Sequence, residues 1–220
     1  SHELKTPLTT LMLGSHIKKV NLSKGNLSAF LPEQLKKMFE ADDKQFNRIT
    51  HLIDDMLDIS RIDSGKLSMN FEQFDLCNLV QDLVERSLEL FAVAGCEVKF
   101  ETCQSVVGTW DQFRIEQVVV NLITNTMRYA PGKQIEISTS KKGDQYITIV
   151  VKDYGMGISL EDQKRIFTRF ERAVPSANFG GLGLGLYIAK QIVDQHHGDI
   201  QVESELEKGA KFTVTLPVKA

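Results

Sequence analysis

Residues 118–131, VVVNLITNTMRYAP, decide the fold that we expect for this chain. Apolar residues such as Val118 and Leu122 recur here at helical spacing and predict a helix that faces a core. Asn121 and Asn125 are four residues apart, so their amides lie on one side of that helix. Because a buried, unpaired amide is costly, the pair indicates either a solvated face or a reserved polar task.

The composition is that of a soluble, weakly acidic chain. Its 220 residues carry 26 Lys and Arg against 29 Asp and Glu, a formal net charge of −3. This balance argues against a protein that coats nucleic acid or an anionic membrane. No apolar run reaches the roughly 20 residues that span a bilayer. We therefore expect a cytoplasmic location, with any membrane-bound sensor segment outside this portion of the protein.

The cysteines predict no disulfide framework and no metal centre. The chain contains only three of them, at positions without metal-ligand spacing. We interpret them as reduced structural thiols. They are Cys77, Cys96 and Cys103.

The first 65 residues have the pattern of an antiparallel helical hairpin. Residues 4–20 are predicted to form a helix, followed by a loop at 21–32 that is rich in Ser, Gly and Asn. A longer helix follows, in which apolar residues step alternately by three and four, as in a helical bundle. Asp42 and Gln45 interrupt this stripe, which either sets the register or marks a frayed level. We place the domain boundary after residue 65.

The two predicted helices differ in length. Pairing them back from the loop places His2 opposite about Thr50, so the second helix continues for about eleven residues, or ~16 Å, past its partner. This predicts that the natural chain has further helix before Ser1 and that the present segment associates weakly. The side chains expected to lack a covering helix are Leu52, Met56 and Ile59.

The opening SHELKTPL gathers polar groups around one histidine. His2 and Thr6 are four residues apart, so a hydroxyl can lie beside the imidazole. Pro7 lacks a backbone N–H and leaves the Glu3 carbonyl without its helical partner. Glu3 reaches the histidine only through a particular rotamer. The alternative is a surface histidine without a chemical role, which is how we interpret the other four histidines.

Residues 66–220 show the irregular order of helices and strands that is typical of the α+β class. Asp75, Asp111 and Ser159 are each predicted to cap a helix. We expect the helices to lie on one face of a mixed sheet. Extended segments are predicted at 67–71, 98–100, 135–140, 146–152, 200–204 and 211–216.

Two glycine-rich segments are suited to binding a nucleotide. Asp153 follows a predicted strand, and its carboxylate can accept a hydrogen bond from an adenine amino group while Gly155 and Gly157 allow close approach of the backbone. Residues 180–186 open a helix, where unpaired N–H groups suit phosphate oxygens. A plain turn and a flexible loop are the alternatives. The side chains that offer an aromatic face or a cation are Tyr129, Arg128, Arg169 and Arg172.

Taken together, these segments resemble the sequence boxes of sensor histidine kinases. Residues 121–125 resemble the N box, 153–157 and 181–186 the two glycine boxes, and 166–170 the F box; the opening SHELKTP is similar to the H box. The resemblance covers essentially the whole chain and implies an α+β protein. It implies a hairpin at 1–65, truncated at its N-terminus, that forms half of a dimeric four-helix bundle for dimerisation and histidine phosphotransfer. It implies a Bergerat-fold α/β sandwich, like that of gyrase ATPases, that binds ATP at 66–220.

The resemblance implies an ATP-dependent protein-histidine kinase of a two-component system. His2 would accept the γ-phosphoryl group, Glu3 would receive the ring proton, and Thr6 would position water when the enzyme dephosphorylates its partner. That partner would be the receiver domain of a response regulator, in which an aspartate takes the phosphoryl group. A homodimer is implied for the full-length protein.

Roles in nucleotide binding follow from the same resemblance. Asn121 and Asn125 would hold Mg²⁺ through oxygen, and Asp153 would recognise adenine. Residues 167–181 would form a lid over the triphosphate. The other residues implied for ATP binding are Arg128, Tyr129, Gly155, Gly157, Phe170, Arg172, Gly181, Gly183, Leu184 and Gly185.

The residue at position 121 also distinguishes the sensor histidine kinases, which this chain resembles, from other ATPases of the same fold. The gyrase, mismatch-repair and heat-shock chaperone ATPases carry Glu at this position as the general base for water. An amide cannot take a proton in this way, which favours transfer to a side chain. A hydrolytic ATPase of the same fold and a non-catalytic binding module remain as alternatives. Thr126 and Leu182 depart from the Ala and the Thr or Ser that are usual in the family.

Overall fold

The computed structural model describes residues 2–171 and 182–219. The chain divides into two compact units, Ser1–Ser64 and most of residues 65–220. Among the described residues, no helix combines the length and the apolar composition needed to cross a bilayer.

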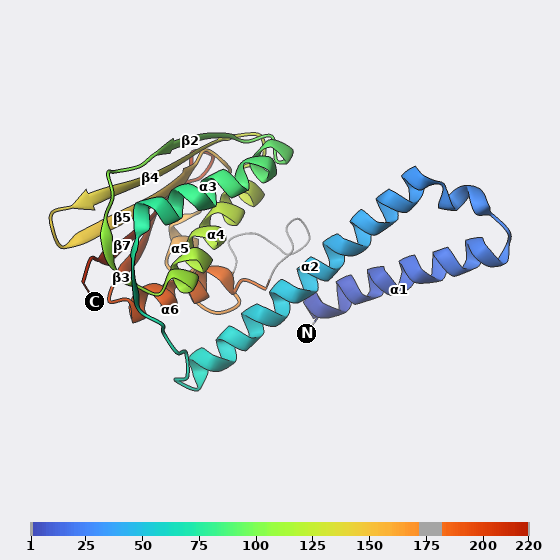
Figure 1. Ribbon diagram of the computed structural model, residues 1–220, viewed down its shortest axis with the longest axis horizontal. Helices are drawn as coiled ribbons and strands as arrows, with labels where there is room; N and C mark the ends of the chain where they lie inside the picture. The colour runs from blue at the N-terminus through green and yellow to red at the C-terminus, as the bar shows by residue number, and fades with distance from the viewer. Residues whose placement is uncertain (1, 172–181, 220) are drawn as a thin grey trace. The chain divides into compact units, whose positions relative to one another are not determined.

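The first unit is an antiparallel helical hairpin (Figure 1). Helix α1 spans His2–Ser23, the short 3₁₀ helix η1 spans Leu27–Phe30, and α2 spans Pro32–Asp63. Pro32 is the first residue of α2, where the missing N–H removes no helical hydrogen bond. Helix α1 begins before and ends after its predicted range of 4–20.

The polar interruption of the α2 stripe is explained by a contact across the hairpin. Asp42 forms an ion pair with Lys18 of α1, and each side chain is only about a quarter exposed. The pair joins residues on the two antiparallel helices and therefore favours one register between them. This supports the interpretation that Asp42 sets the register.

The apolar residues at the end of α2 are less exposed than we expected. Leu52 and Ile59 are buried, and Met56 is half-buried. Positions 52 and 59 are seven residues apart and share one face of the helix. That Leu52, Met56 and Ile59 lack a covering helix within the hairpin stays a prediction.

The second unit is built on a five-stranded mixed sheet of order β2-β4-β5-β7-β6. Neighbouring strands β2 and β4 are parallel, and the other neighbours are antiparallel. A separate ribbon pairs β1 with β3 in antiparallel fashion. The strands are β1 (Glu72–Asp75), β2 (Glu97–Glu101), β3 (Val107–Trp110), β4 (Gln134–Lys142), β5 (Tyr146–Asp153), β6 (Asp199–Glu205) and β7 (Gly209–Pro217).

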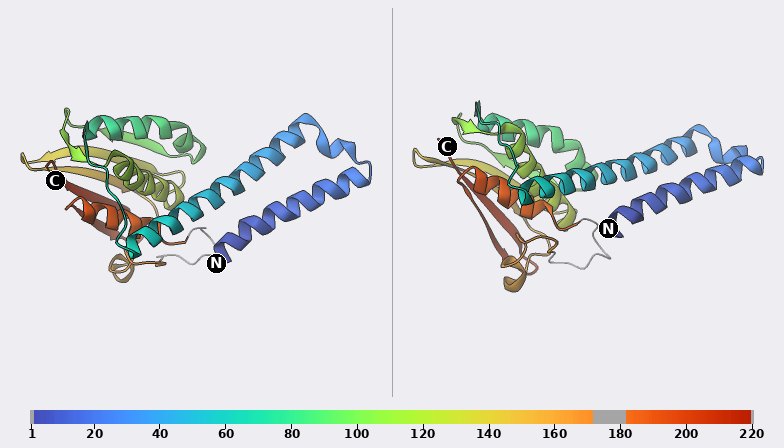
Figure 2. Two further views of the ribbon diagram at one scale, coloured as in Figure 1. Left: turned by 60° about the horizontal axis from the view of Figure 1, so that its bottom comes forward. Right: turned by 90° about the horizontal axis from the view of Figure 1, so that it is seen from below.

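The helices of this unit cover one face of the sheet, as the two views of Figure 2 make clear. They are α3 (Leu76–Val93), α4 (Gln112–Tyr129) and α6 (Gly185–Gln195), with the short α5 (Leu160–Gln163) after β5. The core lies between these layers, where Ile147, Ile149 and Val151 of β5 are fully buried. The predicted class, a helical N-terminal region followed by an α/β domain with a mixed sheet, is confirmed.

The predicted helix caps are present. Asp75 accepts hydrogen bonds from the backbone of Cys77 and Asn78, Asp111 accepts one from Arg114, and Ser159 accepts one from Asp162. The extended run expected at 67–71 is not a strand, since pairing begins only at Glu72. Strand β3 was not expected, because four residues that include a glycine are too short to show a clear alternation.

His196 at the end of α6 is fully buried, so its interpretation as a surface residue is wrong. Its Nε2 accepts a hydrogen bond from the Asp111 backbone N–H at 3.0 Å, and Nδ1 lies 2.8 Å from the Ile192 carbonyl oxygen. Nδ1 therefore carries the proton of a neutral ring. Burial lowers the pKa of His196 from its usual value of 6.5. The ring ties the end of α6 to the start of α4.

This burial predicts a dependence of stability on pH. As the pH falls below 6.5, the His196 ring takes a proton in the unfolded chain but stays neutral in the folded one. The free energy of unfolding is therefore largest above pH 6.5 and decreases below it. The loss should approach roughly 1.4 kcal/mol per pH unit. Urea unfolding of His196→Gln between pH 7.5 and 5 should show a shallower dependence. His197→Asn, at an exposed ring, should keep the original slope; equal slopes in all three proteins would refute the prediction.

Candidate functional site

The amide of Asn121 joins the middle of α4 to the first turn of α6. Its Nδ2 donates a hydrogen bond to the Gly185 carbonyl oxygen at 2.6 Å. A Cβ atom added at Gly185 would lie 2.2 Å from Asn121 Oδ1, so the contact requires a residue without a side chain. Because Nδ2 is engaged, Oδ1 is the atom that can serve as an oxygen ligand. This donor set fits Mg²⁺, which prefers oxygen ligands and retains positions for phosphate and water.

Two polar residues, Asn125 and Thr126, follow Asn121 along α4. Asn125 is half-buried one turn beyond Asn121. Thr126 is buried, and its hydroxyl donates to the Ile123 carbonyl oxygen at 2.7 Å, so it is satisfied within the helix. The departure from the usual alanine therefore adds no free hydroxyl beside the two amides.

Asp153 ends β5 as a buried carboxylate. It continues the alternation of Ile149 and Val151, so its side chain faces the helices and is only 4% exposed. Oδ1 accepts hydrogen bonds from the backbone N–H groups of Gly155 at 2.9 Å and Ala210 at 3.3 Å. Burial raises the pKa of Asp153, against the effect of these two donors. Both bonds from the described residues reach Oδ1, which leaves Oδ2 to accept from a ligand.

Three glycines allow the backbone to pass close around Asp153. A Cβ at Gly155 would lie 2.5 Å from the Tyr129 carbonyl oxygen at the end of α4. Gly157 has a φ of +70° and passes against Glu205, where a Cβ would lie 2.0 Å from the carbonyl oxygen. Gly209 has a φ of +90° and passes against Asp153 itself in the same way. Gly209 was missed from the sequence, where it looks like an ordinary turn glycine.

The start of α6 presents backbone donors. The first helical hydrogen bond runs from Ile188 N–H to the Leu184 carbonyl oxygen at 2.8 Å, so the N–H groups of residues 185–187 have no partner within the helix. The helix dipole adds positive potential there. Gly183 precedes the helix with a φ of +69°. Leu184 is only 2% exposed, so its side chain belongs to the core and only its backbone can reach a ligand.

The other residues predicted to bind the nucleotide lie at the end of α4 and in the segment around Phe170. At the end of α4, Arg128 is exposed and Tyr129 is half-buried. Phe170 is 60% exposed and has a left-handed φ of 62°, with the Arg169 guanidinium 5.5 Å from its ring centroid. Arg172, Gly181 and the part of the predicted lid at 172–181 lie outside the described residues.

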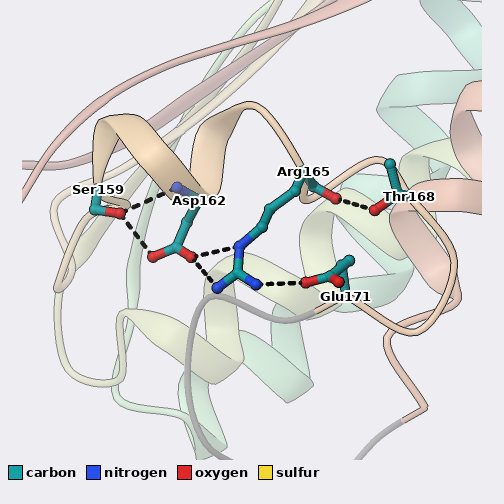
Figure 3. A network of polar contacts seen from close by, with 5 residues as sticks. All are labelled: Ser159, Asp162, Arg165, Thr168 and Glu171. Atoms are coloured by element: carbon teal, nitrogen blue, oxygen red, sulfur yellow. Dashed lines mark hydrogen bonds and ion pairs between the residues drawn. The ribbon is translucent and has the colours of Figure 1, made fainter.

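A polar network orders the segment that precedes residue 172 (Figure 3). Arg165 donates to Asp162 Oδ1 through Nη2 at 2.6 Å and Nε at 3.0 Å, and to Glu171 Oε2 through Nη1 at 2.8 Å. Hydrogen bonds from Ser159 and Arg165 lower the pKa of Asp162. The Thr168 hydroxyl donates to the Arg165 carbonyl oxygen at 2.6 Å. Of this network, the sequence predicted only the helix cap at Ser159.

The predicted phosphoacceptor segment is helical. His2 is the first residue of α1, and Thr6 is exposed one turn further on. The helix continues through Pro7, which is buried. The side chains of His2 and Glu3 lie outside the described part of the structure.

Family comparisons match both units. The model described as histidine kinase-, DNA gyrase B- and HSP90-like ATPase matches residues 110–220. The chain belongs to this ATPase family. A second model, the His Kinase A (phospho-acceptor) domain, matches residues 1–65.

Individual relatives agree with this family. Sensor protein SrrB of Staphylococcus aureus strain MRSA252 is 32% identical over 220 residues, which cover 99% of this chain and 36% of SrrB. The structure of Acinetobacter baumannii histidine kinase AdeS aligns with a TM-score of 0.75 at 26% identity, over 99% of this chain and 98% of that one. The catalytic domain of histidine kinase ThkA aligns with a TM-score of 0.60 at 26% identity, over 69% and 100% of the two chains. Together with both family matches, these relatives identify this chain as a sensor histidine kinase catalytic core.

The contact of Gly209 with Asp153 generates a prediction for this catalytic core. Gly209→Ala should destabilise the second unit by about 3 kcal/mol or more, because the new Cβ meets backbone at 2.0 Å in addition to adopting a left-handed φ. Gly143→Ala is the matched control, since Gly143 has a φ of +66° with nothing within 4 Å. It should lose only about 1–2 kcal/mol. Equal losses in urea unfolding would show that the close approach at Gly209 is unimportant.

Proposed function

We propose that this chain is the catalytic core of an ATP-dependent protein-histidine kinase in a two-component system. The observation that carries the proposal is the side-chain amide of Asn121 at the first turn of α6. An amide at this position can orient a metal-bound triphosphate, but it cannot act as the general base that a hydrolytic ATPase needs. The match of residues 1–65 to a phospho-acceptor domain supplies the alternative acceptor.

The donors and acceptors of the second unit suit ATP. Asp153 Oδ2 would accept from the adenine amino group, while Gly155 and Gly157 allow the base to approach the backbone. The free N–H groups at the start of α6 would bind phosphate oxygens. When bound, Mg²⁺ would neutralise phosphate charge. Asn121 and Asn125 would hold it through their amide oxygens.

The transfer is an in-line displacement at the γ-phosphorus. A ring nitrogen of His2 would attack the phosphorus as its bond to the β–γ bridging oxygen breaks, and ADP would leave. Glu3 would take the ring proton. The phosphoryl group would then pass to an aspartate of a response regulator receiver domain. When the enzyme instead removes the phosphoryl group from the regulator, Thr6 would position the attacking water.

The hairpin supports a homodimer for the full-length protein. Large exposed apolar side chains mark interaction surfaces, and both helices of the hairpin carry them. We propose that two hairpins pair through these residues into a four-helix bundle. Sensing, and any attachment to a membrane, would belong to portions of the full-length protein outside this chain, which covers 36% of SrrB. The exposed residues include Leu8, Met12, Leu13, Ile17, Phe39, Phe46, Ile53 and Leu57.

The acceptor residue is tested by labelling with γ-³²P ATP. The chain should acquire acid-labile, base-stable label, and His2→Gln should abolish it while changing ATP affinity by less than about twofold, because the acceptor does not belong to the nucleotide site. His16→Gln, at an exposed histidine of the same helix, should label normally.

Two outcomes of the labelling experiment would favour the alternatives. Free phosphate released without label on the protein would support a hydrolytic ATPase. Tight ATP binding without any label, even in a chain extended upstream of Ser1, would support a binding module.

Adenine recognition is tested by Asp153→Asn. The amide oxygen can still accept from Gly155 and Ala210, but an NH₂ group replaces the Oδ2 acceptor and opposes the adenine amino group. We expect ATP affinity to fall by about 10- to 100-fold in calorimetry, the equivalent of roughly 1–3 kcal/mol. Asp144→Asn, in an exposed turn, should bind as the wild type does. Unchanged affinity in Asp153→Asn would rule out this recognition.

A further inference from the structure

Two cysteine thiols meet in the second unit, outside the site described above. Cys77 in the first turn of α3 and Cys103 after β2 are 26 residues apart in sequence, and their sulfur atoms lie 2.6 Å apart. A covalent S–S bond measures about 2.05 Å, so the two sulfurs need to move together by only about half an ångström to reach bonding distance. Both are free thiols in this structure.

The surrounding backbone holds both cysteines in place. The Cys77 N–H donates to Asp75 Oδ1 at 2.9 Å within the cap of α3. The Cys103 N–H donates to the Thr139 carbonyl oxygen of β4 at 3.1 Å. The Thr139 hydroxyl oxygen lies 3.6 Å from each of the two sulfurs. Because these anchors belong to a helix cap and a central strand, little conformational freedom remains to be lost when the sulfurs join.

The two thiols differ in access. Cys77 is only 2% exposed, whereas Cys103 is half-buried. Burial, followed by the hydrogen bond with Cys103, raises the pKa of the Cys77 thiol. An oxidant from solvent therefore meets Cys103 first, and Cys77 is placed to react with the product.

We propose that Cys77 and Cys103 form a redox-active pair that a hydroperoxide converts into an intramolecular disulfide. The Cys103 thiolate attacks the peroxide oxygen, the O–O bond breaks, and a sulfenic acid forms with release of water or an alcohol. Cys77 sulfur then attacks Cys103 sulfur, the S–O bond breaks, and water leaves. The two sulfurs together lose two electrons, which reduce the peroxide. A dithiol reductant reverses the reaction.

The disulfide would close a loop that contains α3 and β2 and would join the start of α3 to the residues that follow β2. Closing a loop of this length restricts the unfolded chain and raises the stability of the folded one. The expected increase of the unfolding midpoint is roughly 5–15 °C.

The experiment treats the native chain with hydrogen peroxide and removes the peroxide. It then blocks the remaining thiols with N-ethylmaleimide in denaturant and digests the chain without reduction. Mass spectrometry should find one linked peptide pair, Cys77 with Cys103, and a fully alkylated Cys96. The thermal midpoint should rise on oxidation and return after dithiothreitol.

Variants separate this pair from general cysteine oxidation. Cys103→Ser, at the half-buried position, should fold and lose both the linked peptide and the thermal shift. Cys96→Ser should retain both, because the hydrogen bonds of the Cys96 thiol within the described residues run to the Ala94 and Ala130 carbonyl oxygens, at 3.7 and 3.5 Å. The proposal is overturned if Cys77 and Cys103 are both alkylated after peroxide, if Cys103 is oxidised to a sulfinic acid beside a free Cys77, or if the link forms only in denaturant.

Discussion

The hydrogen bond from Asn121 Nδ2 to the Gly185 carbonyl oxygen is the contact on which the candidate site depends. It engages Nδ2 of the amide on α4, so Oδ1 is the atom that can serve as a ligand. It also seats against α4 the first turn of α6, whose N–H groups have no partner within the helix. A nucleotide with a bound metal ion would therefore find two complementary groups: the amide oxygen on α4 for the metal ion and the N–H groups of α6 for the phosphates. The contact exists only because position 185 has no side chain.

Asp153 shows how a sheet can hold a carboxylate in a core. Strand alternation turns the side chain toward the helices, where an ionised group without partners would be costly. The two backbone donors to Oδ1 offset part of that cost. They are available because Gly155, Gly157 and Gly209 let three segments of backbone converge on the end of β5. These glycines therefore let backbone segments of the protein pack against one another, in addition to leaving room for a ligand.

Local chemistry explains what could be predicted from the sequence. Helix caps such as Asp75 and Asp111 act within three residues, and the glycine-rich segments are contiguous, so each is visible without the fold. The features that were missed depend on distant partners. His196 resembles a surface histidine at a helix end until α6 packs against the start of α4, 85 residues earlier. Gly209 meets Asp153 only through the pairing of β5 with β7. The partners of Arg165 likewise depend on how the chain turns after α5.

The position of the asparagine pair follows from how α4 is held at both ends. At its start, Asp111 accepts the Arg114 N–H at Oδ1 and the Asn70 N–H at Oδ2, and it donates its own N–H to His196. At its end, the Tyr129 carbonyl oxygen lies against Gly155. An α-helix rises 1.5 Å per residue, so Asn121 lies ~15 Å from Asp111 on a nearly rigid rod. A shift of the Asp111 anchor by one residue would turn the helix by about 100° and move the Asn121 amide away from Gly185. The contacts at the two ends of α4 therefore help to set the geometry of the site.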